Sequence, residues 1–169
     1  MWWFSDPVSS VNTLLADIIS PPKAAQFAPP ILTRAEVELK LQQADAMANG
    51  VALVGGMDDK EGNVYVFDPV NGRWGAVCDT AWTRNNARVI CRQLGFNDAV
   101  RHFGLPPILP SNNHPAVTSP GSRFGTVPSP FQFLFNHARC FGDETDFRQC
   151  PGINNHGCQS GNVAGVECS

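Results

Sequence analysis

The pattern of apolar and polar residues divides the chain near residue 50. Before that point apolar residues recur at helical spacing, and after it they alternate as they do in strands. Asp6 and Pro7 predict the start of a first helix, and Ser20-Pro21-Pro22 predicts its end. The apolar positions of this helix share one stripe: Val11, Leu14, Leu15, Ile18 and Ile19.

A second helix is predicted after a connector rich in proline and alanine that ends at Pro30. Thr33 and Glu36 have the spacing of a capping box, so the helix should begin there and run through Met47, with its end at Asn49-Gly50. Its apolar face consists of Val37, Leu41, Ala44 and Ala48. We call residues 1–50 the N-terminal arm.

The N-terminal arm cannot bury its own apolar stripe, because two short helices joined by prolines share too little surface to offset the entropy lost on ordering. Two fates are open to it: it folds back on its own domain, or it docks on a partner. We favour docking, with Trp2, Trp3 and Phe4 as anchors beside the stripe of the first helix. The tryptophans also suit a membrane interface.

The region after residue 50 begins with a predicted hairpin followed by a helix. Residues 63–68 alternate like a half-buried strand, Asn71-Gly72 is typical of a two-residue type I′ turn, and residues 73–78 form the returning strand. Thr83 should cap the helix and Gly95 should end it. Its apolar face comprises Ala87, Ile90, Cys91 and Leu94, so Cys91 is expected to point into the core.

Six cysteines lie in the second half of the chain, at positions 78, 91, 140, 150, 158 and 168. Their even number and their spacings favour three disulfides over a zinc cage. Disulfides persist in oxidising surroundings, so we expect an extracellular site or an organelle lumen, such as the thylakoid lumen or the mitochondrial intermembrane space, and not the cytosol. The formal net charge is −3 and no basic tract occurs, which argues against nucleic-acid binding.

Several motifs together resemble a scavenger receptor cysteine-rich domain of the six-cysteine group, over about residues 51–169. They are VALVGG, EGNVYVF, GRWGAVCDTAW, ARVICRQLGF, the C-x-G-x-E motif that begins at Cys140, and the ending AGVEC. The resemblance implies an α+β fold in which a curved antiparallel sheet cradles one helix. It also implies the disulfide pairs Cys78–Cys158, Cys91–Cys168 and Cys140–Cys150.

The chain departs from the family pattern in two places. A long loop rich in proline, serine and glycine, at about residues 104–130, exceeds the family length. The cation site of some family members would fall on Asp79, Asn136 and Glu144, but Thr80 and Asn136 stand where carboxylates are expected. Fewer charged ligands mean weaker calcium binding, so no cofactor is required and calcium is doubtful.

No pattern in the chain points to catalysis. His102, His114, His137 and His156 are interpreted as loop residues, and no nucleophile stands at a recognised spacing from them. We therefore expect a non-catalytic protein-interaction module, anchored through the N-terminal arm as an accessory subunit of a larger assembly. The alternative is a secreted recognition protein for polyanionic or microbial ligands, held by Arg84, Arg88 and Arg92 unless these simply form a solvated helix face.

Overall fold

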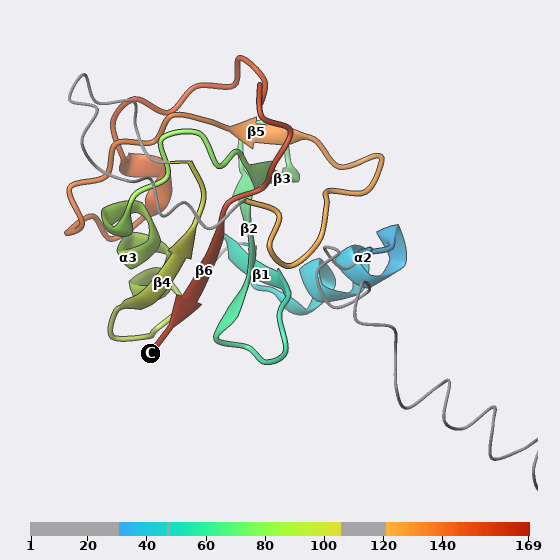
Figure 1. The fold of residues 1–169 in the computed structure, drawn as a ribbon, viewed down its shortest axis with the longest axis horizontal. Helices are drawn as coiled ribbons and strands as arrows, with labels where there is room; N and C mark the ends of the chain where they lie inside the picture. The colour runs from blue at the N-terminus through green and yellow to red at the C-terminus, as the bar shows by residue number, and fades with distance from the viewer. Residues whose placement is uncertain (1–30, 47, 106–120) are drawn as a thin grey trace, which may run out of the picture.

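The computed structural model describes residues 31–46, 48–105 and 121–169, and the labels below follow Figure 1. The helices are α2 (Arg34–Gln43), α3 (Arg84–Gln93) and the short 3₁₀ helix η2 (Phe147–Gln149). The strands are β1 (Val51–Gly55), β2 (Glu61–Asp68), β3 (Arg73–Val77), β4 (Ala99–Phe103), β5 (Phe133–Phe135) and β6 (Gly165–Cys168). The first predicted helix lies outside these residues.

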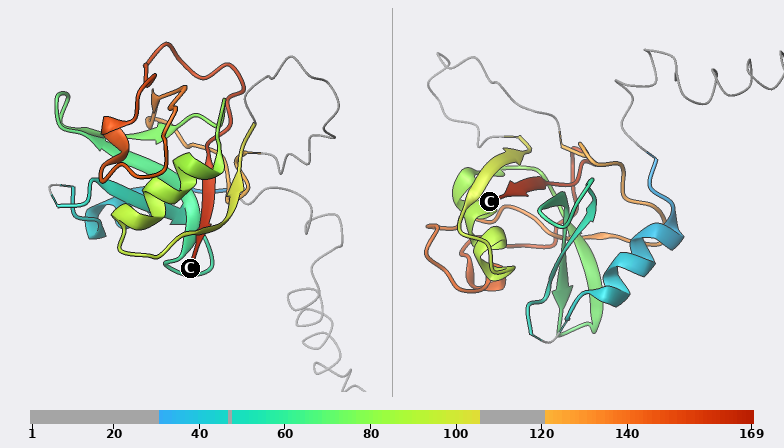
Figure 2. Two further views of the ribbon diagram at one scale, coloured as in Figure 1. Left: turned by 90° about the vertical axis from the view of Figure 1, so that its left-hand side faces the viewer. Right: turned by 90° about the horizontal axis from the view of Figure 1, so that it is seen from below.

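One curled sheet organises the domain, with strand order β4-β6-β2-β3-β5 and β1 paired to β2. Every pairing is antiparallel except that of β3 with β5. The two long helices lie on opposite sides of this sheet (Figure 2). The predicted α+β class and the sheet cradling α3 are confirmed, and α2 is a second helix on the other face.

Strands β1 and β2 are buried on both faces. Along β2, Val64 and Val66 join the core beneath α3, whereas Tyr65 joins the cluster beneath α2. In β1, Val51 and Leu53 likewise face one core and Ala52 and Val54 the other. The prediction of a half-buried strand at residues 63–68 was therefore wrong, because α2 covers the face that was expected to meet solvent.

Both ends of α3 follow the sequence prediction closely. The side chain of Thr83 accepts a hydrogen bond from the backbone of Asn86, and Gly95 adopts a φ of +93° just past the helix. Cys91 is fully buried. The predicted start, end and inward-facing cysteine of α3 are all confirmed.

The connection from β2 to β3 differs from the prediction. The register pairs Asp68 with Arg73, so four residues separate the strands instead of the two of a type I′ turn. The Asp68 carboxylate accepts hydrogen bonds from the backbone of Val70 and Asn71, which stabilises the longer turn. Gly72 adopts the left-handed conformation alone, at a φ of +64°.

Helix α2 begins as predicted but ends sooner. Thr33 and Glu36 form the full capping box. The helix stops at Gln43, and Asp45 then organises a turn: its side chain accepts the amide of Ala48 and its carbonyl accepts that of Asn49. A carboxylate that bonds nearby amides offers the backbone an alternative to helix, which explains the early end.

This helix packs on the protein's own sheet. Val37 and Leu41 are buried in a cluster with Ala52, Val54 and Tyr65. The second helix of the N-terminal arm thus folds back on the domain. The arm boundary at residue 50 remains a prediction, since the arm's first thirty residues lie outside the described part.

The later part of the long 104–130 loop also packs on the sheet. Ser122 exchanges hydrogen bonds with Val163, and the side chain of Asn63 donates to the carbonyl of Gly125. The Phe124 ring meets that of Phe103 edge to face, with centroids 5.5 Å apart. Residues 106–120 of this loop lie outside the described residues.

Candidate binding surfaces

Three disulfides fix the framework of the domain. They join Cys78 to Cys158, Cys91 to Cys168 and Cys140 to Cys150, which are the pairs that the resemblance implies. No cysteine is free, so no thiolate is present to act as a nucleophile. Among the described histidines, His102, His137 and His156, no ring hydrogen-bonds to a serine, threonine or carboxylate.

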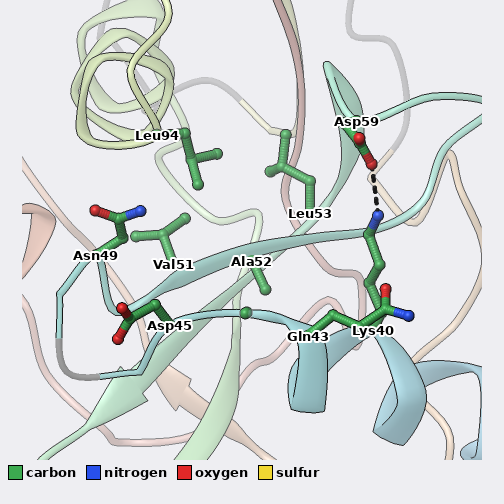
Figure 3. Close-up of a pocket in the computed structure, with 10 residues that line it drawn as sticks. Lys40, Gln43, Asp45, Asn49, Val51, Ala52, Leu53, Asp59 and Leu94 are labelled. Carbon is green, nitrogen blue, oxygen red and sulfur yellow. Dashed lines mark hydrogen bonds and ion pairs between the residues drawn. The ribbon is translucent and has the colours of Figure 1, made fainter.

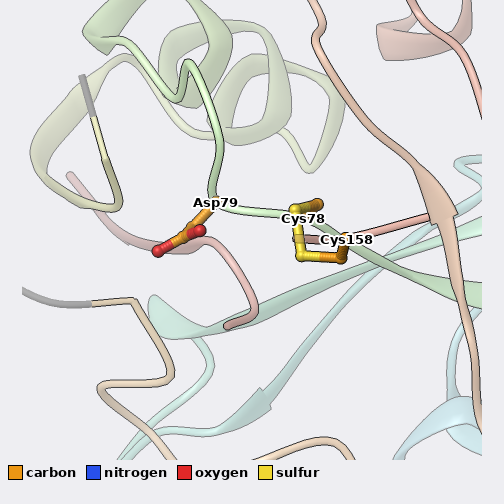
Figure 4. A group of neighbouring side chains, drawn as sticks. All are labelled: Cys78, Asp79 and Cys158. Carbon is orange, nitrogen blue, oxygen red and sulfur yellow. A yellow bond between two sulfur atoms is a disulfide. The ribbon is translucent and has the colours of Figure 1, made fainter. Parts of the chain in front are cut away.

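Asp79 is a fully buried carboxylate at the end of β3, next to the Cys78–Cys158 disulfide (Figure 4). Its Oδ1 accepts a hydrogen bond from the Ser160 hydroxyl at 2.5 Å, and Oδ2 faces Gly121 so closely that a Cβ there would lie 2.2 Å away. Burial raises the pKa of Asp79 above its usual value. This side chain ties β3 to the segment around Ser160.

The other two residues of the predicted cation site have partners of their own. The Asn136 side chain donates to the carbonyl of Gly157 at 2.6 Å. Glu144 accepts the amides of Phe141 at 2.7 Å and Gly142 at 2.9 Å. Burial raises its pKa, but hydrogen bonds from backbone amides outweigh that effect and hold the pKa of Glu144 below its usual value.

No hydrogen bond joins these three side chains to one another in the described residues. Asp79 and Glu144 each lie beside a disulfide, with Cys78 and Cys158 around the first and Cys140 and Cys150 around the second. Disulfide sulfurs are not thiolates and make poor metal ligands. Calcium binding therefore stays a prediction.

The predicted arginine stripe is partly neutralised. Arg84 and Arg88 both pair with Asp98, at 3.3 and 3.0 Å, and Arg92 bonds to the carbonyls of Asn97 and Gly142 at 3.4 Å each. The hydrogen bond from Arg88, aided by that from the Ala99 amide, lowers the pKa of Asp98 to about 2. The stripe thus has less free positive charge than its sequence indicates.

An open cleft of about 480 Å³ lies between the start of α3 and the segment that follows β5. We call it the Phe141 cleft, and its lining residues are Ala81, Thr83, Asn85, His137, Ala138, Arg139, Cys140 and Phe141. Buried Asn86 joins its two walls: the side chain donates to the carbonyls of Ala81 and Ala138 and accepts the amide of Cys140 at 3.0 Å. Phe141 itself is 75% exposed.

A second hollow, of about 400 Å³, follows β1 between α2 and the end of α3 (Figure 3). Lys40 of α2 reaches over it to Asp59, with 2.8 Å between Nζ and Oδ1. Leu94 lines its opposite side. Because Val51 and Leu53 on its floor are buried, this hollow marks the seam where α2 is attached.

The geometry defines a disulfide-clamped α+β module with exposed clefts and no nucleophile–base pair among its described residues. The family model of the scavenger receptor cysteine-rich domain matches residues 54–169, so the chain belongs to the SRCR family. SRCR domains are protein-interaction and recognition modules. Together with the three disulfides, this family indicates an oxidising extracellular or lumenal environment.

Individual proteins are also similar to this chain. The chain is 36% identical over 125 residues to a scavenger receptor cysteine-rich domain superfamily protein of Patiria pectinifera, across 72% of this chain but only 9% of that protein. Among solved structures, the third SRCR domain of murine neurotrypsin is 33% identical, with a TM-score of 0.49 over 70% of this chain and 94% of that one. The dimeric form of the SRCR domain of mouse MARCO is 24% identical, with a TM-score of 0.44 over 76% and 97%.

Some predicted site residues lie outside the described part of the chain, and some residues of the observed surfaces were not predicted. The proposed anchors of the N-terminal arm, residues 2–4 and the stripe from Val11 to Ile19, lie outside the described residues. In the described part of the chain, neither long helix has the length and apolar character needed to span a bilayer. Sequence reasoning missed Asn86, Asp98 and Phe141. The one available signal was the aromatic residue inside the C-x-G-x-E motif.

Proposed function

We propose that the chain is a non-catalytic protein-interaction module that serves as an accessory subunit of a larger assembly, on the lumenal or external side of a membrane or outside the cell. One observation carries the proposal: a framework locked by three disulfides presents the open Phe141 cleft with a largely exposed aromatic ring. Rigid modules with exposed aromatic anchors bind with little loss of conformational entropy.

The N-terminal arm has a definite role in this proposal. Helix α2 is seated on the sheet, and Ile31, the first described residue, is 86% exposed. The aromatic tip and the apolar stripe of the first predicted helix then dock on the partner or its membrane interface. The alternative of a secreted polyanion receptor is less favoured, because Asp98 already pairs with Arg84 and Arg88.

Hydrogen exchange tests this proposal when it is measured on the isolated chain and on native material purified without denaturant. We expect protection of residues 2–19 in the native material alone, because in this proposal the partner supplies the surface on which they are ordered. Helix α2 serves as the internal control, since it is packed on the sheet and should be protected in both samples. Protection of residues 2–19 in the isolated chain, or in neither sample, would contradict the accessory role.

A further inference from the structure

The Phe141 cleft presents its aromatic ring from a fixed backbone. The amides of Phe141 and Gly142 both donate to the Glu144 carboxylate, and the neighbouring Cys140 is buried in a disulfide. The backbone that carries the exposed ring is therefore held on both sides of Phe141. An aromatic side chain on such a support can bury its surface against a partner without ordering the loop beneath it.

The walls of the cleft store backbone strain. Three non-glycine residues in the described parts of the chain have positive φ, and two of them line this cleft: Ala81 at 59° and His137 at 58°. The bonds from Asn86 to both walls hold these conformations in place. Nδ1 of His137 is buried without a hydrogen-bond partner within the described residues. Strained residues and unsatisfied polar atoms cluster at ligand sites, where a bound group can satisfy them.

The charges at the rim favour an acidic ligand. Arg139 is exposed, and no acid pairs with its guanidinium in the part of the chain that the structure describes. Helix α3 has no acidic residue in its first turn, so the positive end of its dipole is not compensated there. Of the two acids in the C-x-G-x-E motif, Glu144 is occupied by two backbone amides and Asp143 is exposed. Neither acid lines the cleft, where Arg139 is the one charged residue among the lining residues.

We propose that the Phe141 cleft binds a segment of a partner protein in which an acidic side chain stands next to a bulky apolar one. The apolar side chain packs on the Phe141 ring, and the carboxylate reaches Arg139 and the amino end of α3. This inference rests on the proposed function as an interaction module and names the chemistry of its partner. It requires no metal ion.

Selection of random displayed peptides on the immobilised full chain tests the inference, with the double variant Phe141→Ala/Arg139→Gln used for counter-selection. We expect enrichment of sequences that place Asp or Glu next to Leu, Ile, Phe or Trp. A synthetic peptide of the enriched sequence should then lose at least about tenfold in affinity with either single variant. Added salt should weaken its binding, because the rim is exposed.

Two variants elsewhere on the surface serve as matched controls. Met57→Ala removes a side chain that is 97% exposed, and Arg73→Gln removes another exposed arginine; neither residue lines the cleft. Both should bind the selected peptide like the wild type. Thermal unfolding of all four single variants checks that each is folded.

Three results would overturn the inference: no enrichment, enriched peptides that lack acidic residues, or peptides that bind the cleft variants as tightly as the wild type. Sedimentation of the chain alone tests whether a second copy of the chain occupies the cleft instead. If Phe141→Ala abolishes a self-association of the wild type, a second copy fills the cleft. If the peptide selection fails but residues 2–19 are protected in the native material alone, the accessory role stands and the cleft proposal falls. If the selection succeeds but residues 2–19 do not show that protection, the cleft proposal stands and the accessory role falls.

Discussion

The two faces of the sheet are stabilised in different ways. The core beneath α3 includes Cys91, Cys140, Cys150 and Cys168, so two disulfides cross-link it, Cys91–Cys168 and Cys140–Cys150. The cluster beneath α2 contains no cysteine and is held by apolar packing, beside which Lys40 of α2 pairs with Asp59. The family match begins at residue 54, after α2 and most of β1. Helix α2 thus lies before the family match and is attached by burial rather than by covalent bonds.

The largest effect is expected from opening the disulfide beneath α3. Cys91→Ala together with Cys168→Ala removes a link between residues 77 positions apart. We expect the free energy of unfolding to fall by about 4 kcal/mol, because the unfolded chain regains the freedom that the closed loop denied it. Urea unfolding at equilibrium measures this loss.

Hydrogen exchange on the same double variant sharpens the comparison of the two faces. Protection should fall first in α3, β4 and β6, which pack on one another, while α2 and β1 retain theirs. The reduced wild type, with all three disulfides open, gives the upper limit. Equal loss of protection on both faces would show that the faces unfold as one unit.

On the other face, Leu41→Ala should weaken the attachment of α2. Leu41 is 6% exposed in the cluster with Val37 and Tyr65, and truncation of such a side chain costs about 3 kcal/mol through lost burial and the cavity left behind. Leu39→Ala is the matched control on the same helix. Leu39 is 58% exposed, so its truncation should change the unfolding free energy by less than about 0.5 kcal/mol.

The region that loses hydrogen-exchange protection is as informative as the size of the stability loss. In the Leu41→Ala variant, exchange should rise in α2 while α3 stays protected, because the disulfides hold the second face independently. If Leu41→Ala lowers the free energy of unfolding as little as Leu39→Ala does, α2 contributes little to the stability of the domain.

A smaller effect is expected at the capping box of α2. In Thr33→Ala the amide of Glu36 loses its acceptor, the Thr33 Oγ at 3.3 Å, and stability should fall by about 1 kcal/mol. Thr33→Ser retains a hydroxyl at this position and should unfold close to the wild type in the same urea titration. If serine fails to restore stability, the threonine acts through its methyl group rather than as a cap.

Features set by neighbouring residues were predictable from the sequence. The caps at Thr33 and Thr83 and the helix end at Gly95 depend on hydrogen bonds and backbone angles within a few residues, so the local pattern was sufficient. The early end of α2 at Gln43 was also a local effect, but it needed the Asp45 side chain to be considered as a competitor for backbone amides.

Features set by distant contacts were not predictable from a single sequence. Burial of β2 on both faces requires α2 to return to the sheet, and the strand pattern contains no sign of that return. Neutralisation of Arg84 and Arg88 requires Asp98 to approach α3 from the start of β4. The Phe141 cleft likewise forms only where Asn86 joins two segments that are 52 residues apart.

The smallest effect concerns the ion pairs that add to the disulfides on the α3 face. The hydrogen bond from Arg88 lowers the pKa of Asp98 from 3.8 to about 2 in the folded state, so the folded protein favours the ionised carboxylate. The stabilisation is complete above the unfolded pKa of 3.8 and is lost as the pH falls toward 2. Urea unfolding of the wild type and of Asp98→Asn across this range should show the two stability curves converging at low pH.

Because both arginines also bond to Asp98 at the surface, the stability difference between the two proteins should shrink in high salt. Curves that coincide at every pH would instead assign the role of Asp98 to its hydrogen bond with the Ala99 amide, which asparagine can retain.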